Sequence, residues 1–265
     1  MNLFLLEGLA FFLYFASSST LIIDIKENRY KKLALILAWI AAFTHFLALS
    51  LIIWQKQGID FSFFHTASII SLIIAFLLLV ASFSKPVEKL GIALFPIAAL
   101  MLVLDIIYPS TIQPAQEYSL AMNTHILSSI IAFSLLTIAA FQALLLAVQN
   151  SQLKNHNPGR LMLAFPPLQA MESLLFQMIS TGLLFLSISL LSGFIFIEDL
   201  FAQHLVHKTI LSITAWIIFS SLLIGRKRYG WRGKTAVRWT LYGFISLLLA
   251  YFGSKLVLEL ILNKV

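Results

Sequence analysis

Long apolar stretches, separated by short polar segments, recur along the whole chain. Each is near twenty residues long, which is the length that crosses about 30 Å of hydrocarbon as a helix. Their apolar residues do not alternate with polar ones, as the strands of a membrane barrel do. The pattern therefore predicts eight membrane-spanning helices, at 2–23, 33–54, 64–83, 90–108, 122–148, 174–197, 208–225 and 236–258.

Composition agrees with an all-α polytopic membrane protein. Of the 265 residues, 60% are hydrophobic and only 11% are charged, and the mean hydropathy is +0.94. A soluble domain carries about 25% charged residues, so these charges are too few to coat a water-exposed surface. Because the polar segments are short, we expect a single membrane domain over residues 1–265, with no separate soluble part.

The basic residues are distributed unequally between the two ends of the predicted helices. Fourteen of the eighteen Lys and Arg follow the first, third, fifth and seventh spans, and four fall on the other side. By the positive-inside rule the first side is cytoplasmic, so both termini are expected on the non-cytoplasmic side. The formal charge of +7 is then explained by topology and anionic lipid, and we do not expect nucleic-acid binding.

Carboxylates are missing from the centres of the predicted spans. Those near span ends are expected to be solvated at the interface, and they are Glu7, Asp24, Asp105, Glu172, Glu198 and Asp199. Ion-coupled transporters and proton pumps use ionisable groups at membrane depth, so this pattern disfavours that class. The chain has no cysteine, which excludes disulfides, thiolate metal sites and covalent c-type haem attachment to it.

Histidine is the residue type that points to chemistry, because imidazole is the commonest protein metal ligand and an axial ligand of haem iron. The predicted topology places five of the six histidines in the outer half, namely His45, His65, His125, His204 and His207. His45 lies nine residues before Trp54, roughly 13 Å beneath the outer boundary, whereas the other four lie near that boundary. Two ligands of one iron need similar depth, so we expect His125 to pair with one of the other three boundary histidines and not with His45. For each histidine the alternative is an ordinary hydrogen bond to headgroups or to a packing partner.

Several short segments occur in an order and at spacings that are typical of one membrane protein family. They are His125 followed by ILSS and a long apolar helix, THFLAL at 44–49, PPL at 166–168 with ME at 171–172, 183–193 ending in LLSG, 208–216, GWRG at 230–233 and AYFGS at 250–254. Together they resemble the cytochrome c assembly (CcsA/ResC-type) membrane protein family, with the closer match to its YpjD-like subgroup. The resemblance covers roughly residues 30–260.

The resemblance implies haem handling for cytochrome c biogenesis in a bacterial inner membrane, with haem held near the outer face by histidine. Haem, apocytochrome c and other assembly proteins are the partners it implies, and His125 carries over as the axial ligand of haem iron. His45, His65, His204 and His207 are further candidates for haem contact.

The sequence departs from the family in three places: it has no tryptophan between Gly193 and Lys208, no histidine at 223–226 and none after Phe252. We therefore expect a haem-binding or accessory role in assembly. The alternative is a haem-free transporter or transporter accessory that retains the fold. No Gly-rich phosphate loop, HExxH or GxSxG is present, so a classical enzyme acting on soluble substrates is not expected.

Overall fold

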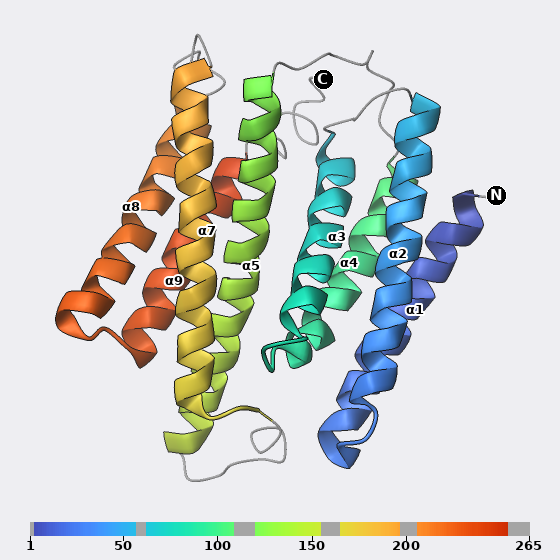
Figure 1. The fold of residues 1–265 in the computed structure, drawn as a ribbon, viewed down its shortest axis with the longest axis horizontal. Coiled ribbons are helices and arrows are strands. Elements are labelled where there is room, and N and C mark those ends of the chain that lie inside the picture. The colour runs from blue at the N-terminus through green and yellow to red at the C-terminus, as the bar shows by residue number, and fades with distance from the viewer. Residues whose placement is uncertain (1–2, 57–61, 109–119, 155–164, 197–205, 254–265) are drawn as a thin grey trace. The chain divides into compact units, whose positions relative to one another are not determined.

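The computed structural model describes residues 3–56, 62–108, 120–154, 165–196 and 206–253, which are helical apart from short turns (Figure 1). No strand occurs within these ranges. Eight of the described helices are long and apolar enough to cross a membrane, which confirms the predicted all-α class and the eight spans. The helices group into two compact units, and the expectation of a single membrane domain stays a prediction.

The first unit comprises residues 1–117 and 159–165. Its described helices are α1 (Leu3–Glu27), α2 (Lys31–Lys56), α3 (Phe63–Ala81), the short 3-10 turn η1 (Glu88–Leu90) and α4 (Gly91–Ile107). Each long helix packs against the next one along the chain, and α4 also packs against α1, so the bundle closes on itself. Ala10, Ala38 and Ala41 are fully buried, and such small residues let membrane helices approach closely.

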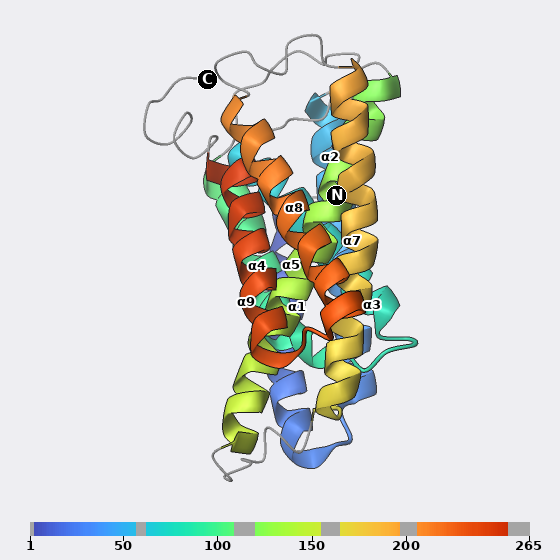
Figure 2. The same ribbon diagram turned by 90° about the vertical axis from the view of Figure 1, so that its left-hand side faces the viewer.

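The second unit comprises residues 118–158 and 166–265. Its described helices are α5 (Leu120–Lys154), α7 (Leu168–Phe196), α8 (Val206–Tyr229), α9 (Gly233–Leu248) and a final π-helical turn, η2 (Leu249–Gly253). Here too the neighbours in sequence pack together, and α9 returns to α5. Figure 2 shows α8 and α9 side by side, with the chain reversing between them.

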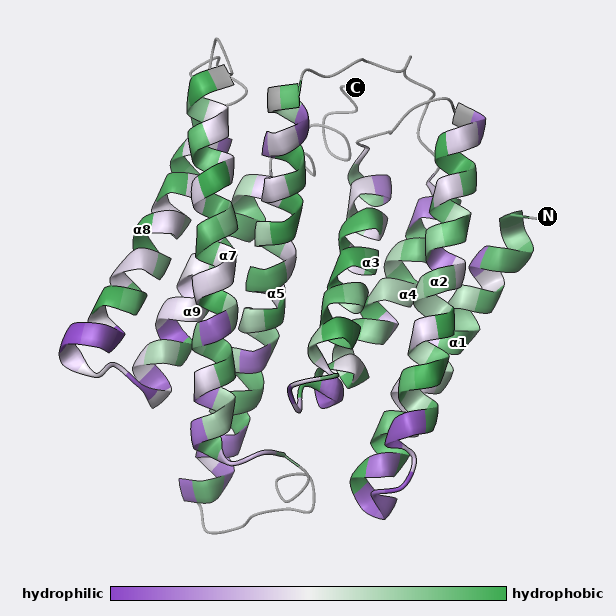
Figure 3. Cartoon of the chain, viewed as in Figure 1, coloured by the Kyte–Doolittle hydropathy of each residue, from purple (hydrophilic) through white to green (hydrophobic). Residues whose placement is uncertain are grey.

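Hydropathy along the helices fits a membrane environment. In Figure 3 hydrophilic residues gather at helix ends, most clearly at the α1–α2 turn and at the end of α8. Large apolar side chains such as Phe12, Phe43 and Ile195 are exposed on the helix surfaces. A protein in water rarely exposes so much apolar surface, so lipid is the natural solvent of these faces.

The start of α7 differs from the prediction, which placed the span from residue 174. In the structure α7 already begins at Leu168. The Pro167 carbonyl accepts hydrogen bonds from the N–H groups of Ala170 and Met171. Proline suits this position, because the first helical turn does not need its missing N–H.

Candidate functional site

His45 lies in the interior of the first unit and is fully buried. Its Nε2 is 3.0 Å from Oγ of Ser68 on α3, and its Nδ1 is 3.4 Å from the hydroxyl of Tyr14 on α1. Both ring nitrogens therefore have hydroxyl partners, and the imidazole joins three helices. This is the packing hydrogen bond considered as the alternative for His45, and an iron could bind only if one of the two contacts were broken.

His65 on α3 is buried and pairs with Asp105 on α4, which is partly exposed. The distance from Nδ1 of His65 to Oδ2 of Asp105 is 2.9 Å. A carboxylate only accepts, so Nδ1 carries a proton, and in the neutral ring Nε2 bears the lone pair. That Nε2 is buried and has no hydrogen-bond partner within the described part of the chain. A carboxylate on the other nitrogen is the arrangement that fixes metal-ligating histidines.

The Asp105–His65 pair predicts a specific loss of stability. We expect Asp105→Ala to lower the free energy of unfolding by about 1–3 kcal/mol, because both nitrogens of a buried imidazole then lack a partner. Asp105→Asn keeps an oxygen that can accept from Nδ1 and is expected to cost less. Thermal melting of the two purified variants in detergent measures the difference, and equal melting temperatures would contradict the pairing.

Several carboxylates expected at a solvated interface are in fact buried. Glu7 is 5% exposed, Asp24 2% and Glu172 6%, so the prediction is wrong for these three. For Asp24 and Glu172 the physical reason is that polar partners from other parts of the chain replace water around the carboxylate. Glu198 and Asp199 lie outside the described residues.

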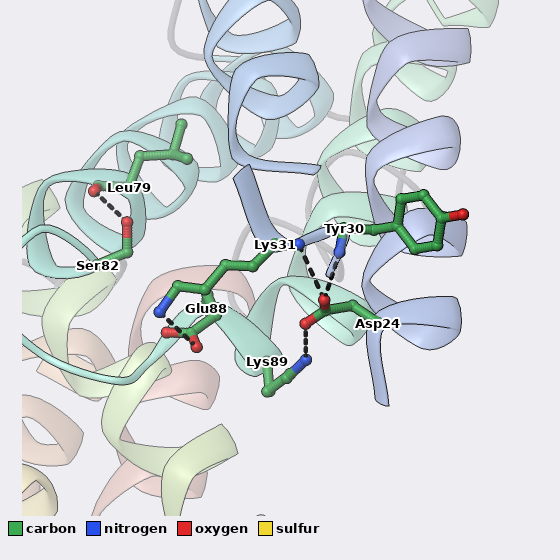
Figure 4. A network of polar contacts seen from close by, with 7 residues as sticks. All are labelled: Asp24, Tyr30, Lys31, Leu79, Ser82, Glu88 and Lys89. Atoms are coloured by element: carbon green, nitrogen blue, oxygen red, sulfur yellow. Dashed lines mark hydrogen bonds and ion pairs between the residues drawn. The ribbon is translucent and has the colours of Figure 1, made fainter. Parts of the chain in front are cut away.

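Asp24 shows such a set of partners at the α1–α2 turn (Figure 4). Its Oδ1 accepts from the backbone N–H of Tyr30 at 2.8 Å and of Lys31 at 2.9 Å. Its Oδ2 accepts from Nζ of Lys89 on η1. Asp24 thus accepts hydrogen bonds from N–H groups that are otherwise free at the start of α2. The positive end of the helix dipole also stabilises a carboxylate there.

Glu172 has a corresponding role in the second unit. Its Oε1, on the second turn of α7, accepts from the backbone N–H of Gly233 at 2.7 Å. Gly233 opens α9 with φ of +53°, a left-handed conformation that glycine adopts without strain. The contact joins the ME and GWRG segments of the sequence, which are far apart along the chain.

His125 is held between α5 and α7 of the second unit. Its Nδ1 lies 2.8 Å from the backbone carbonyl of Ser189. Since a carbonyl only accepts, Nδ1 carries the proton and Nε2 of the neutral ring bears the lone pair. Ser129 supports the arrangement, because its hydroxyl lies 2.5 Å from that of Ser189 and 2.6 Å from the His125 carbonyl oxygen.

The structure says less about the remaining histidine candidates for haem contact. His207 is exposed in the first turn of α8, and His204 lies outside the described residues. His65 and His125 belong to different units, so their predicted pairing stays a prediction. Within the described residues no group of three or more His, Cys, Asp or Glu is placed to hold a metal ion.

The hydrogen-bond partners of these histidines were missed by sequence analysis. A helix carbonyl such as that of Ser189 leaves no sequence signal at all. The His65–Asp105 pair did leave a signal. His65 is near the start of the third predicted span and Asp105 near the end of the fourth, so both are expected on the same side of the membrane. Tyr14 and Ser68 looked like ordinary residues of apolar helices.

Eight apolar helices, with histidines fixed by contacts between helices, define a polytopic helical membrane protein. The family model for cytochrome C assembly protein matches residues 8–262, and the chain belongs to this family, as its resemblance predicted. It is 33% identical over 243 residues to the inner membrane protein YpjD of Escherichia coli (strain K12), which covers 89% of this chain and 90% of the relative. It is 31% identical over 144 residues to an uncharacterized 28.8 kDa protein of Azospirillum brasilense, which covers 54% of this chain and 53% of the relative. No solved structure matches the chain.

Proposed function

We propose that this protein binds haem at the end of the second unit that carries His125, as a carrier or accessory in cytochrome c biogenesis. Nε2 of His125 would be an axial ligand of the iron. The observation that supports this most is the hydrogen bond from Nδ1 to the Ser189 carbonyl. Metal-ligating histidines almost always donate their other N–H to a carbonyl, carboxylate or water, which fixes the tautomer and leaves the second nitrogen free for the metal.

The other histidine candidates differ in how well their ring nitrogens are suited to haem. His65 has the same donor pattern as His125, with Asp105 on Nδ1 and a buried Nε2 that has no partner in the described part. His207 and His204 stay candidates, and His45 is the least suited because both its nitrogens are engaged. Bound haem would supply the iron chemistry, while the protein would supply ligation and orientation.

Family membership supports a location for the protein and a set of partners. We place the protein in a bacterial inner membrane, the location named for its Escherichia coli relative. Its His125 end and both termini would face the non-cytoplasmic side, as the distribution of Lys and Arg indicates. On that side it would meet apocytochrome c or other assembly proteins.

Absorbance spectroscopy of the purified protein tests the haem proposal. We expect a Soret band from the wild type, and we expect His125→Ala to lose most of it. His156→Ala is the matched control, because His156 follows the fifth span on the predicted cytoplasmic side and its loss is expected to leave the band unchanged. A wild type that stays colourless after reconstitution with haem would refute the proposal.

The orientation can be tested separately, because the chain has no cysteine of its own. A membrane-impermeant maleimide applied to intact spheroplasts is expected to label Thr124→Cys, near His125, and to leave Arg228→Cys unlabelled. Both positions are exposed on helix ends. The opposite labelling would place the haem site on the wrong side of the membrane.

A haem-free transporter or transporter accessory is the second candidate function. It is supported by the first unit, where Glu7 and the His65–Asp105 pair place ionisable groups inside the bundle. Such groups in membrane proteins commonly line ion or proton pathways. Solute or proton flux in vesicles that Glu7→Gln abolishes and His125→Ala leaves intact would favour this function over the first.

A further inference from the structure

A polar and cationic groove lies between α7 and α8 in the second unit. It is open to the outside and has a volume of about 700 Å³. Its polar lining consists of Ser173, Gln177, Ser180, Thr181, Arg226 and Lys227. None of these side chains belongs to the histidine sites described above. The groove faces outward, because Gln177 and Ser180 on α7 and Lys227 on α8 are exposed.

Arg226 is the charged centre of this groove. Its guanidinium carbon lies 3.7 Å from the centroid of the Phe176 ring, and this stacking holds the planar fork in place. Its Nη1 is buried and finds no acceptor among the described residues. A charged donor without an acceptor is costly, so an anionic group that bound this guanidinium from the groove would stabilise it.

The α7 side of the groove supplies neutral polar groups. Ser173, Gln177 and Ser180 follow at spacings of four and three residues and so share one face of the helix. The Gln177 amide donates to the Ser173 hydroxyl at 3.3 Å, and the Ser180 hydroxyl donates to the Phe176 carbonyl at 2.7 Å, which leaves their oxygens free to accept. Polar groups beside hydrocarbon need hydrogen-bond partners, so this polar strip favours the binding of a polar ligand.

The groove opens at the basic end of α8. Arg226, Lys227 and Arg228 occupy the last turn of that helix, which is strongly hydrophilic in Figure 3. Phe176 and Leu223 add apolar surface beside them. The groove therefore combines two cations, hydroxyl and amide groups, and an apolar wall within one continuous surface.

We propose that this groove binds the headgroup of an anionic glycerophospholipid. The phosphate binds Arg226 and Lys227, hydroxyl groups of the headgroup donate to the free oxygens along the polar strip of α7, and the acyl chains follow the apolar wall. Arginine forks match phosphate oxygens in bidentate geometry, and basic pockets between membrane helices are recognised sites for lipid headgroups. A free phosphate would use the cations alone, and a neutral headgroup would leave the two positive charges without compensation.

Native mass spectrometry of the full-length protein in detergent tests this proposal, with phosphatidylglycerol, phosphatidylcholine or inorganic phosphate added. We expect phosphatidylglycerol to bind in preference to phosphatidylcholine. Arg226→Gln is expected to weaken its binding by about tenfold or more, because charge-assisted hydrogen bonds are lost. Arg228→Gln is the matched control, since it removes the same charge from the same turn but does not line the groove, and it is expected to bind as the wild type does.

A second variant keeps the test valid if Arg226→Gln folds poorly. Thr181→Leu fills the groove from α7 without changing any charge, and it is expected to weaken phosphatidylglycerol binding as well. Circular dichroism checks that each variant keeps its helical content. Equal binding of the two lipids, or equal losses in Arg226→Gln and Arg228→Gln, would overturn the proposal.

Two further results would identify a different occupant of the groove and would also overturn the lipid proposal. Binding of inorganic phosphate as tight as that of phosphatidylglycerol would make a free anion the ligand. A dimer that Arg226→Gln dissociates would show that a helix of a second copy fills the groove. None of these measurements depends on haem.

Discussion

Replacing Asp24 with alanine is expected to lower the free energy of unfolding by roughly 3–5 kcal/mol, the cost of breaking a buried ion pair from one side. Asp24 is almost fully buried, and Lys89 is 8% exposed, so the loss leaves an ammonium without its counter-charge. The backbone N–H groups of Tyr30 and Lys31 lose their acceptor at the same time. The midpoint of SDS-induced unfolding of the purified protein measures the effect.

Two controls separate the causes of this loss. Asp24→Ala combined with Lys89→Met removes both charges, and we expect it to recover much of the stability. Lys31→Met breaks only the Lys31–Glu88 pair, in which the Lys31 side chain is 45% exposed and the Glu88 side chain 9%. We expect a smaller loss than for Asp24→Ala, because water screens the exposed end of this pair and no backbone N–H loses its acceptor. If Asp24→Ala were no worse than Lys31→Met, the carboxylate would not hold the α1–α2 turn.

Replacing Glu172 with alanine is expected to cost the second unit about 1.5–3 kcal/mol, the contribution of a hydrogen bond to a charged group. The Gly233 N–H would lose its acceptor at the start of α9, where the chain reverses after α8. Glu172→Gln keeps an oxygen in reach and is expected to cost less. Thermal melting in detergent orders the three proteins as wild type, Glu172→Gln and Glu172→Ala.

Gly233→Ala extends this test from the other side of the contact. A residue with a Cβ is strained at φ of +53°, by roughly 1–2 kcal/mol. Because strain at Gly233 moves the same N–H that Glu172 binds, the losses of Glu172→Ala and Gly233→Ala are expected to be less than additive when combined. Fully additive losses would mean that the carboxylate and the turn act independently.

The candidate site could be predicted only in part. His125 and His65 could be recognised as candidates from their residue type and their predicted depth, and His125 was singled out by the family resemblance. The partners that make each a plausible ligand, the Ser189 carbonyl and the Asp105 carboxylate, come from other helices. His45 was set apart by its greater depth but kept as a candidate for haem contact, whereas the structure shows both its nitrogens engaged in packing.

The sequence alone determined the all-helical membrane class, the eight spans and the family, because each depends on runs of apolar residues or on local segments in a fixed order. Tertiary structure decided which polar groups are buried and what they contact. Asp24 meets Lys89 across 65 positions of the chain, and Glu172 meets Gly233 across 61. The physical reason is that hydropathy is a property of each segment by itself, whereas a hydrogen bond between helices depends on which faces pack together.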